Sequence, residues 1–175
     1  MITVKPKHVT KKLLSALPDR ARDVLEKRYG LGKDADSQTL ESIGQTYGIT
    51  RERVRQIENY GIQSIQKSDV YLEFEEIFDE IKQVIESLGG GLIAEQVLLD
   101  EITNDQSLRN HIYFLLVIGN PFYRSKESAN YGHRWFTEKK TAESVEKALR
   151  TVYKSLSRDE LVSEEEILNR FRTEL

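Results

Sequence analysis

The stretch of residues 40–66, LESIGQTYGITRERVRQIENYGIQSIQ, constrains the fold of this chain more than any other. Apolar residues recur at helical spacing on both sides of Gly48, which suits a turn that needs a positive φ angle. Gly44 is small enough for a close approach of two crossing helices, and the Thr50 hydroxyl can cap the second helix. The pattern predicts two helices joined by a short glycine-containing turn, which is a helix-turn-helix.

The second predicted helix begins with TRERVRQIE, and its polar side chains lie away from the apolar side of the helix. In a helix-turn-helix, the N-terminal residues of this helix meet base edges in the major groove. Arg51 and Arg55 could donate twice to guanine, Gln56 could pair with adenine, and Glu52 could accept from cytosine. The alternative is a solvated helix face with Glu–Arg pairs at helical spacing. The capped glycine turn in front of the helix favours base reading.

Two further helices are expected before the helix-turn-helix, over residues 9–17 and 18–29. Pro18 suits a first helical turn, and Gly30 suits a left-handed C-cap. With these helices in place, LPDRARDVLEKRYGLG followed by TLESIGQTYGITRERVRQIE resembles region 4 of the sigma-70 family of bacterial sigma factors. The resemblance covers about residues 10–66.

The resemblance implies a cytoplasmic, bacterial or phage-encoded protein that recognises a promoter-like element in double-stranded DNA and touches the flap of core RNA polymerase. It implies that Arg51, Glu52 and Gln56 meet bases, and that Arg53 and Arg55 meet phosphates or neighbouring bases. It also implies that Thr39 and Arg28 lie near the DNA backbone.

One departure from the family keeps an alternative open. Family members usually continue with a basic run after RQIE, whereas this chain continues with NYGIQSIQ. Fewer phosphate contacts would weaken DNA binding and its salt dependence. The alternative function is therefore that of an RNA polymerase-binding adaptor, or an anti-sigma-like interaction factor, without sequence-specific DNA binding.

The charge of the chain divides at about residue 67. Residues 1–67 carry 13 Lys and Arg against 8 Asp and Glu, a net charge of +5, whereas residues 68–175 carry 13 against 21, a net charge of -8. A local basic region is compatible with nucleic-acid binding even though the whole chain has a net charge of -3. The two parts are therefore expected to have different roles.

The acidic part begins with a predicted amphipathic helix over Leu72–Leu88, which Gly89–Gly91 end. A short extended segment, two helices and a hairpin of FYRSKES and HRWFTEK around a turn at 129–132 follow. This order is typical of a winged helix. The hairpin offers Arg124, Lys126 and Arg134 as wing contacts to DNA, and the alternative is that such charges protect an edge strand. The candidate third helix, QSLRNHIYFLLVIG, has few base-reading residues, which favours protein binding.

The final helices are predicted over residues 141–156 and after Ser163, which forms a capping box with Glu166. The segment VYKSLSRDELVSEEEILNRF resembles VIESLGGGLIAEQVLLDEI, so these helices are interpreted as a partial second winged-helix repeat. The expected fold is mainly α. It has a helix-turn-helix domain over 1–67, a winged-helix-like α+β domain over 70–140, and C-terminal helices over 141–175.

Enzyme chemistry finds little support in this sequence. It has no Cys, its three His are scattered without metal-ligand spacing, and no phosphate-binding loop, nucleophile motif or carboxylate pair stands out. We expect no catalytic residue, no metal and no cofactor. No apolar run is long enough for a membrane helix, and the first residues lack the apolar stretch of a secretory signal, so no membrane partner is expected. The oligomeric state stays open.

Overall fold

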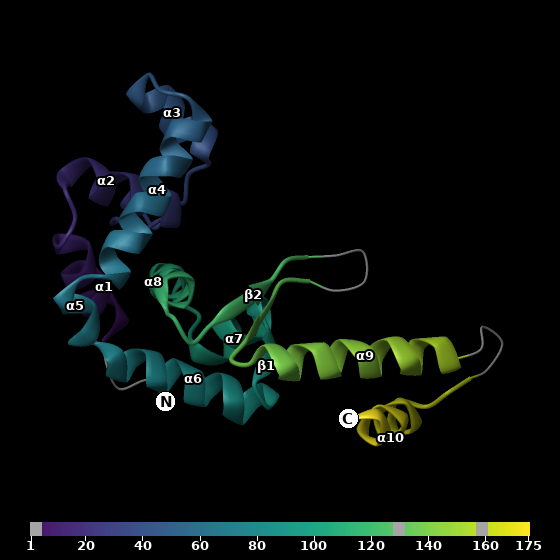
Figure 1. Cartoon of the computed structure of the whole chain (residues 1–175). Helices are drawn as coiled ribbons and strands as arrows, with labels where there is room; N and C mark the ends of the chain where they lie inside the picture. Colours follow the sequence, from purple (N-terminus) through teal and green to yellow (C-terminus); the bar gives the residue numbers. More distant parts are fainter. Residues whose placement is uncertain (1–4, 128–131, 157–160) are drawn as a thin grey trace.

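The computed structural model describes residues 5–127, 132–156 and 161–175, and its elements are mainly helical with one small sheet (Figure 1). The order in this part of the chain is α1 (Pro6–Ser15), α2 (Asp19–Tyr29), α3 (Leu40–Tyr47), α4 (Arg51–Gln66), α5 (Asp69–Leu72), α6 (Glu75–Gly89), β1 (Leu92–Ala94), α7 (Glu95–Ile102), α8 (Gln106–Ile118), β2 (Tyr123–Ser125), β3 (Arg134–Phe136), α9 (Lys139–Ser155) and α10 (Glu164–Glu174). The predicted fold class is confirmed.

The helix-turn-helix consists of α3 and α4, as predicted. Gly48 ends α3 with φ 63° and ψ 34°, the left-handed conformation that an L side chain rarely adopts. The Thr50 hydroxyl accepts a hydrogen bond from the Arg53 backbone N–H at 3.2 Å and so caps α4. A Cβ on Gly44 would lie only 2.7 Å from the carbonyl oxygen of Ile49. The small residue is thus required where α3 meets the turn.

A small cluster of fully buried residues holds α2 against this unit. Val24 of α2 meets Ile43 of α3 and Val54 of α4, and each of the three is 0% exposed. Gly30 ends α2 in the left-handed conformation, as predicted. α1 begins three residues before the predicted start at residue 9, because Pro6 can occupy the first helical turn without losing a hydrogen bond.

The winged-helix arrangement is present over α6 to β3. Three antiparallel strands pair in the order β1-β3-β2, and Trp135 of β3 stands opposite Ile93 of β1 and Arg124 of β2. The short extended segment predicted after the glycines is therefore the third strand of the sheet. Residues 128–131, which hold most of the predicted hairpin turn, lie outside the described residues.

The predicted helix Leu72–Leu88 is wrong at its start, because the helix is interrupted between α5 and α6. Phe74 has φ -119° and ψ 23°, outside the helical region. The break lets the ring of Tyr71 turn inward to 4% exposure, and its hydroxyl accepts from the Asn120 backbone N–H at 2.9 Å. Leu72 is left 62% exposed. A tertiary contact thus overrides the local apolar periodicity.

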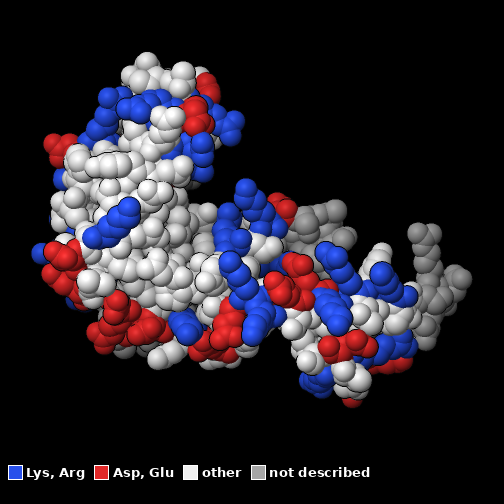
Figure 2. All heavy atoms as spheres, in the orientation of Figure 1, with Lys and Arg blue, Asp and Glu red and all other residues white. Residues whose placement is uncertain are grey.

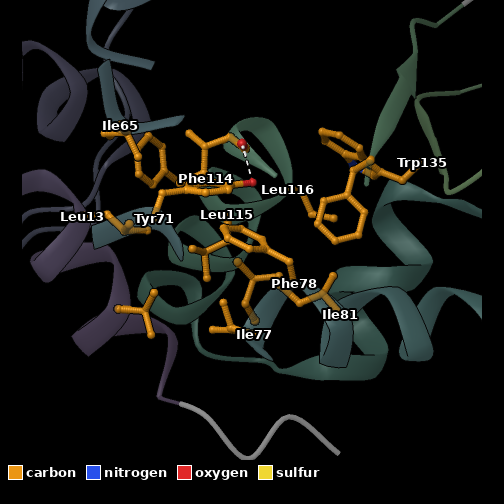
Figure 3. Close-up of a cluster of buried hydrophobic side chains, with 14 of the residues drawn as sticks. Leu13, Ile65, Tyr71, Ile77, Phe78, Ile81, Phe114, Leu115, Leu116 and Trp135 are labelled. Atoms are coloured by element: carbon orange, nitrogen blue, oxygen red, sulfur yellow. Dashed lines mark hydrogen bonds between the residues drawn. The ribbon is translucent and has the colours of Figure 1, made fainter. Parts of the chain in front are cut away.

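One large buried cluster joins the helix-turn-helix half to the winged helix (Figure 3). Leu13 of α1 and Ile65 of α4 lie in the same cluster as Phe78 of α6, Phe114 of α8 and Trp135 of β3. α8 packs against α1, α2 and α4. The expected boundary near residues 67–70 falls in the turn between α4 and α5, and apolar packing continues across it.

Side-chain hydrogen bonds to the backbone also cross this boundary. The Asn110 amide of α8 donates to the carbonyl oxygens of Gly30 and Ala35 at 2.9 and 2.7 Å. The Gln66 amide at the end of α4 donates to the Ile118 carbonyl at 2.9 Å. Such bonds fix the orientation of two units in a way that apolar packing alone does not.

The last two helices form a pair that extends away from the rest of the chain (Figure 1). α9 packs against β3, and α10 packs along α9. The Ser163 hydroxyl caps α10 by accepting from the Glu166 backbone N–H at 3.2 Å, which is one half of the predicted capping box. The Glu166 carboxylate accepts from Arg170 at 2.6 Å, one turn further along the helix.

Candidate nucleic-acid interface

The N-terminal half of α4 lies at the tip of the molecule, and its polar side chains face solvent. Arg51, Glu52, Arg53, Arg55 and Gln56 are all exposed, whereas the intervening valine points into the helix-turn-helix core. Figure 2 shows Lys and Arg gathered around the end formed by α3 and α4, and Asp and Glu along α6. The predicted base-reading residues are thus together and accessible.

Two of these side chains form a forked ion pair within the helix. The Arg55 guanidinium donates to both carboxylate oxygens of Glu52, at 2.8 and 2.7 Å. The hydrogen bonds from Arg55 are the main cause that holds the pKa of Glu52 below its usual value. Glu52 is therefore ionised at neutral pH, and it partly neutralises Arg55 before any ligand is bound.

A second contact within α4 orients the side chains of Arg53 and Gln56. The Arg53 guanidinium donates to the Gln56 side-chain oxygen at 3.0 Å. A glutamine whose oxygen is occupied in this way keeps its amide N–H groups for another acceptor. These pairs orient the side chains, and DNA binding would have to exchange them for contacts to bases and phosphates.

The two residues expected near the DNA backbone have structural contacts in the helix-turn-helix. Thr39 is exposed and caps α3, since its hydroxyl accepts from the Ser42 backbone N–H at 3.1 Å. Arg28 donates to the Gln38 carbonyl at 3.1 Å, and its Nε lies 3.4 Å from the Glu58 carboxylate. DNA contacts by Thr39 and Arg28 stay predictions.

Glu58 connects Arg28 to the core of the domain. It is only 9% exposed, and it accepts a hydrogen bond from the Tyr29 hydroxyl at 2.9 Å. Burial, followed by the nearby Glu58 carboxylate, raises the pKa of Tyr29 far above its usual value, so the tyrosine stays a neutral donor. The arrangement anchors the loop after α2 to α4.

Sequence reasoning missed a second group of cations beside the turn. Lys27 of α2 donates to the Tyr47 hydroxyl at 3.2 Å and lies 5.1 Å from the centre of the Tyr47 ring. The Arg20 guanidinium lies 5.6 Å from the same ring. The basic residues of α2 were visible in the sequence, but only the tertiary packing of α2 on α3 brings them to Tyr47, beside the turn.

The structure gives a physical reason for part of the unusual sequence after RQIE. A Cβ on Gly61 would lie 3.0 Å from Cδ1 of Leu25, so a larger residue would press on the core. Ile65 is 0% exposed, and Gln66 binds the carbonyl of Ile118 in α8. Packing thus explains Gly61, Ile65 and Gln66, whereas Asn59, Tyr60 and Gln63 are exposed, so burial is not the reason that they are uncharged.

Two of the three candidate wing contacts are engaged inside the fold. The Arg124 guanidinium forms a two-point pair with Glu95 at 2.7 and 3.0 Å, and Glu95 also accepts from the Trp135 indole at 2.9 Å. Arg134 is 8% exposed and donates to Glu146 at 3.0 Å. These contacts favour the structural alternative for both arginines, whereas Lys126 is exposed.

The third helix of the winged helix has no open face for a DNA groove. Residues 107–118 of α8 are all buried or half-buried, because α1, α2 and α4 cover one side and α7 covers another. His111 is 7% exposed, and burial lowers its pKa. In this arrangement α8 is a central packing element.

Across residues 5–127, 132–156 and 161–175, no helix is both long enough and apolar enough to cross a membrane. Within the same ranges, no group of three or more His, Asp or Glu side chains is placed to hold a metal ion.

Comparisons with known proteins agree with the geometry of the N-terminal half. The family model for sigma-70, region 4 matches residues 13–67. RNA polymerase sigma factor SigA of a Nostoc species is 49% identical over 55 residues, which are 31% of this chain and 14% of that protein. RNA polymerase sigma factor SigA1 of Synechococcus elongatus is 50% identical over 54 residues, which are 31% of this chain and 13% of that protein.

The matched segment thus spans a small part of these sigma factors, and it coincides with the end of α1 through α4. It contains the capped turn, the left-handed Gly48 and the exposed half of α4. Residues 13–67 of this chain are therefore a sigma-70 region 4 domain.

Proposed function

We propose that this chain is a bacterial or phage-encoded transcription regulator that works in the cytoplasm and binds a promoter-like duplex element through α4. The observation that carries the proposal is the exposed N-terminal half of α4 in a region 4 domain. In this proposal Arg51 and Gln56 bind base edges, and Glu52 accepts from cytosine once Arg55 is released.

The phosphate backbone on either side of the groove would meet cations of the same lobe. Arg53 and Arg55 lie on α4, while Arg28 and the capping residue Thr39 lie beside the start of α3. Each phosphate contact contributes about one unit to the slope of log affinity against log salt. Because Arg55 is paired with Glu52, we expect a modest salt dependence for this domain.

The winged-helix half would serve a different purpose from base reading. Its third helix is covered, and two arginines of its hairpin are paired within the fold. The shared core makes it a rigid extension of the region 4 domain. We propose that it holds the domain in place by contacts with protein, while region 4 itself contacts core RNA polymerase at its flap.

A DNA-selection experiment followed by variant measurements tests base reading. The full chain is used to enrich binding sites from a randomised duplex pool. Arg51→Ala and Gln56→Ala should each weaken binding to the selected site by about 1–3 kcal/mol and relax discrimination at one position. Arg53→Ala should weaken binding to all sequences alike and flatten the salt dependence.

Matched controls come from exposed residues far from α4. Arg150→Ala on α9 and Gln83→Ala on α6 should leave DNA binding unchanged. If all three α4 variants bind the selected pool as the unmodified chain does, α4 is not a reader and the proposal fails.

The pairing of Glu52 with Arg55 favours a second candidate function. So does the C-terminal half of α4, where NYGIQSIQ stands in place of the basic run of the family. In this alternative the chain is a polymerase-binding adaptor, or an anti-sigma-like factor, without sequence-specific DNA binding. Immobilised chain would retain core RNA polymerase from a bacterial lysate, and the Arg51→Ala variant would retain as much. If the chain enriches a sequence from the duplex pool, and the Arg51→Ala variant no longer does so, this alternative is excluded.

A further inference from the structure

The α9–α10 pair carries large apolar side chains that nothing in the described chain covers. Tyr153 of α9 is 79% exposed, Leu168 of α10 is 45% exposed, and Leu161 and Leu175 on either side of α10 are 105% and 63% exposed. α10 has no buried residue at all. Scattered exposed apolar residues are normal, but several on one helix pair indicate an interaction surface.

The internal repeat shows how the corresponding positions are covered in the first copy. When residues 84–102 are aligned with 152–171, with a one-residue gap in the link between the two helices, Ile85 corresponds to Tyr153 and Leu99 corresponds to Leu168. In the first copy these positions are 0% and 9% exposed, inside the cluster to which α8 contributes. In the second copy the same two positions are open. Among the described residues, no helix covers these two positions of the second copy as α8 covers those of the first.

We propose that a second copy of this chain covers this face, so that two α9–α10 pairs pack as a four-helix unit. A two-fold dimer needs a self-complementary surface. Two amphipathic helix pairs meet this need, because each buries the apolar face of the other around a common core. The α8 helix of a second copy could not fill the gap, because it is covered in its own chain.

The charges beside the apolar face are self-complementary in the same sense. Lys147 and Lys154 lie seven residues apart on one side of α9, and Glu164 and Glu165 form the first turn of α10. All four are exposed, and none of them has an ion-pair partner in the described part of its own chain. A two-fold axis can bring the basic side of α9 in one copy to the acidic start of α10 in the other.

The size of the surface sets the expected strength of the dimer. α9 has 17 residues and so is about 25 Å long, and two neighbouring helices are about 20 Å wide. The face then covers about 500 Å² per copy, or about 1,000 Å² in total, which is at the lower end for specific interfaces. We therefore expect a weak dimer that dissociates on dilution.

Sedimentation equilibrium of the full chain tests the proposal. The chain has a mass of 20.3 kDa, and the weight-average mass should rise from this value toward twice as much between about 1 and about 100 µM. Leu168→Glu should keep the mass at the monomer value over the whole range. Leu88→Glu is the matched control, since Leu88 lies on α6 and is 48% exposed, close to the 45% of Leu168.

A charge-swap experiment tests the orientation of the two copies. The variant with Lys147→Glu and Lys154→Glu should dimerise at least ten-fold more weakly alone, and so should the variant with Glu164→Lys and Glu165→Lys. An equimolar mixture of the two should recover dimers, because each basic side then meets an acidic one. Circular dichroism of every variant checks that the helices are intact.

Two outcomes would overturn the proposal. A chain that stays monomeric up to about 100 µM would assign the face to a different protein. A dimer that Leu168→Glu leaves intact would place the interface elsewhere in the molecule. Both results are independent of DNA binding, so they do not bear on the function proposed for α4.

Discussion

A single buried leucine in α1 can show that the region 4 domain and the winged helix unfold as one unit. Leu13 is 0% exposed and lies in the large cluster that also contains Phe114 and Trp135 (Figure 3). Leu13→Ala removes buried methyl groups from the region 4 side of that cluster. If the cluster is one cooperative core, the loss must be felt at Trp135, which belongs to the other side.

The magnitude follows from the complete burial of the site. Leu→Ala changes in buried positions cost about 2–5 kcal/mol, and the cost is larger where the surroundings cannot collapse into the cavity. The α1 helix that carries Leu13 packs on α8, and the Asn110 and Gln66 side chains tie α8 to the region 4 domain, so we expect a loss of about 3 kcal/mol. With a urea slope of about 2 kcal/mol/M, the unfolding midpoint should fall by about 1.5 M.

Trp135 provides the assay, because it is the only tryptophan of the chain. Its ring is 2% exposed and its indole N–H donates to Glu95 at 2.9 Å, so its fluorescence should change strongly on unfolding. Urea unfolding is followed in parallel by Trp135 fluorescence and by far-ultraviolet circular dichroism. Both midpoints should shift by the same amount in the Leu13→Ala variant.

The control is Leu72→Ala, the same substitution at a position that is 62% exposed. It should change the free energy of unfolding by less than about 0.5 kcal/mol. An unchanged Trp135 midpoint in Leu13→Ala, together with an earlier loss of helical signal, would refute the reasoning. It would show that the two halves unfold separately in spite of their packing.

Three further predictions follow from local geometry. Gly44→Ala should lower the free energy of unfolding by about 2 kcal/mol, because the new Cβ would meet the Ile49 carbonyl. Gly48→Ala should lower it by only about 1 kcal/mol, because the new Cβ would have open space and the cost comes from the positive φ alone. The reverse order of the two losses in urea unfolding would contradict this. Burial lowers the pKa of His111 in the folded chain, so its contribution to stability is complete above the unfolded pKa of about 6.5 and is lost as pH falls below it. His111→Gln should therefore lose less stability than the unmodified chain between about pH 7.5 and pH 5.5, and an equal loss would exclude this role. Limited proteolysis should spare residues 67–70, since the core continues across them, and early cleavage there would indicate a flexible connection.

The helix-turn-helix could be predicted from the sequence because its determinants are local. The left-handed Gly48, the Thr50 cap and the small Gly44 all act within about three helical turns of one another. The same local pattern placed the polar half of α4 on the solvent side. The order of helices and strands in the winged helix could be predicted for the same reason, since each element has its own periodicity.

The remaining features depend on partners that are distant in the sequence. Local periodicity joined residues 72–88 into one helix, whereas Tyr71 binds Asn120 and breaks it. The cations of the hairpin were candidate wing contacts by composition, but Arg124 pairs with Glu95, 29 residues away. A charge pattern shows which residues carry charge, and only the packed chain shows which charges neutralise each other.

The sequence by itself determined the region 4 domain and its exposed helix, and the tertiary structure decided how that domain is joined to the winged helix. The Asn110 amide reaches Gly30 across 80 residues, and the Gln66 amide reaches the Ile118 carbonyl across 52 residues. Such contacts have no local period, since they depend on which faces of several helices meet once each helix has formed. The covered α8 is a consequence of that meeting of faces.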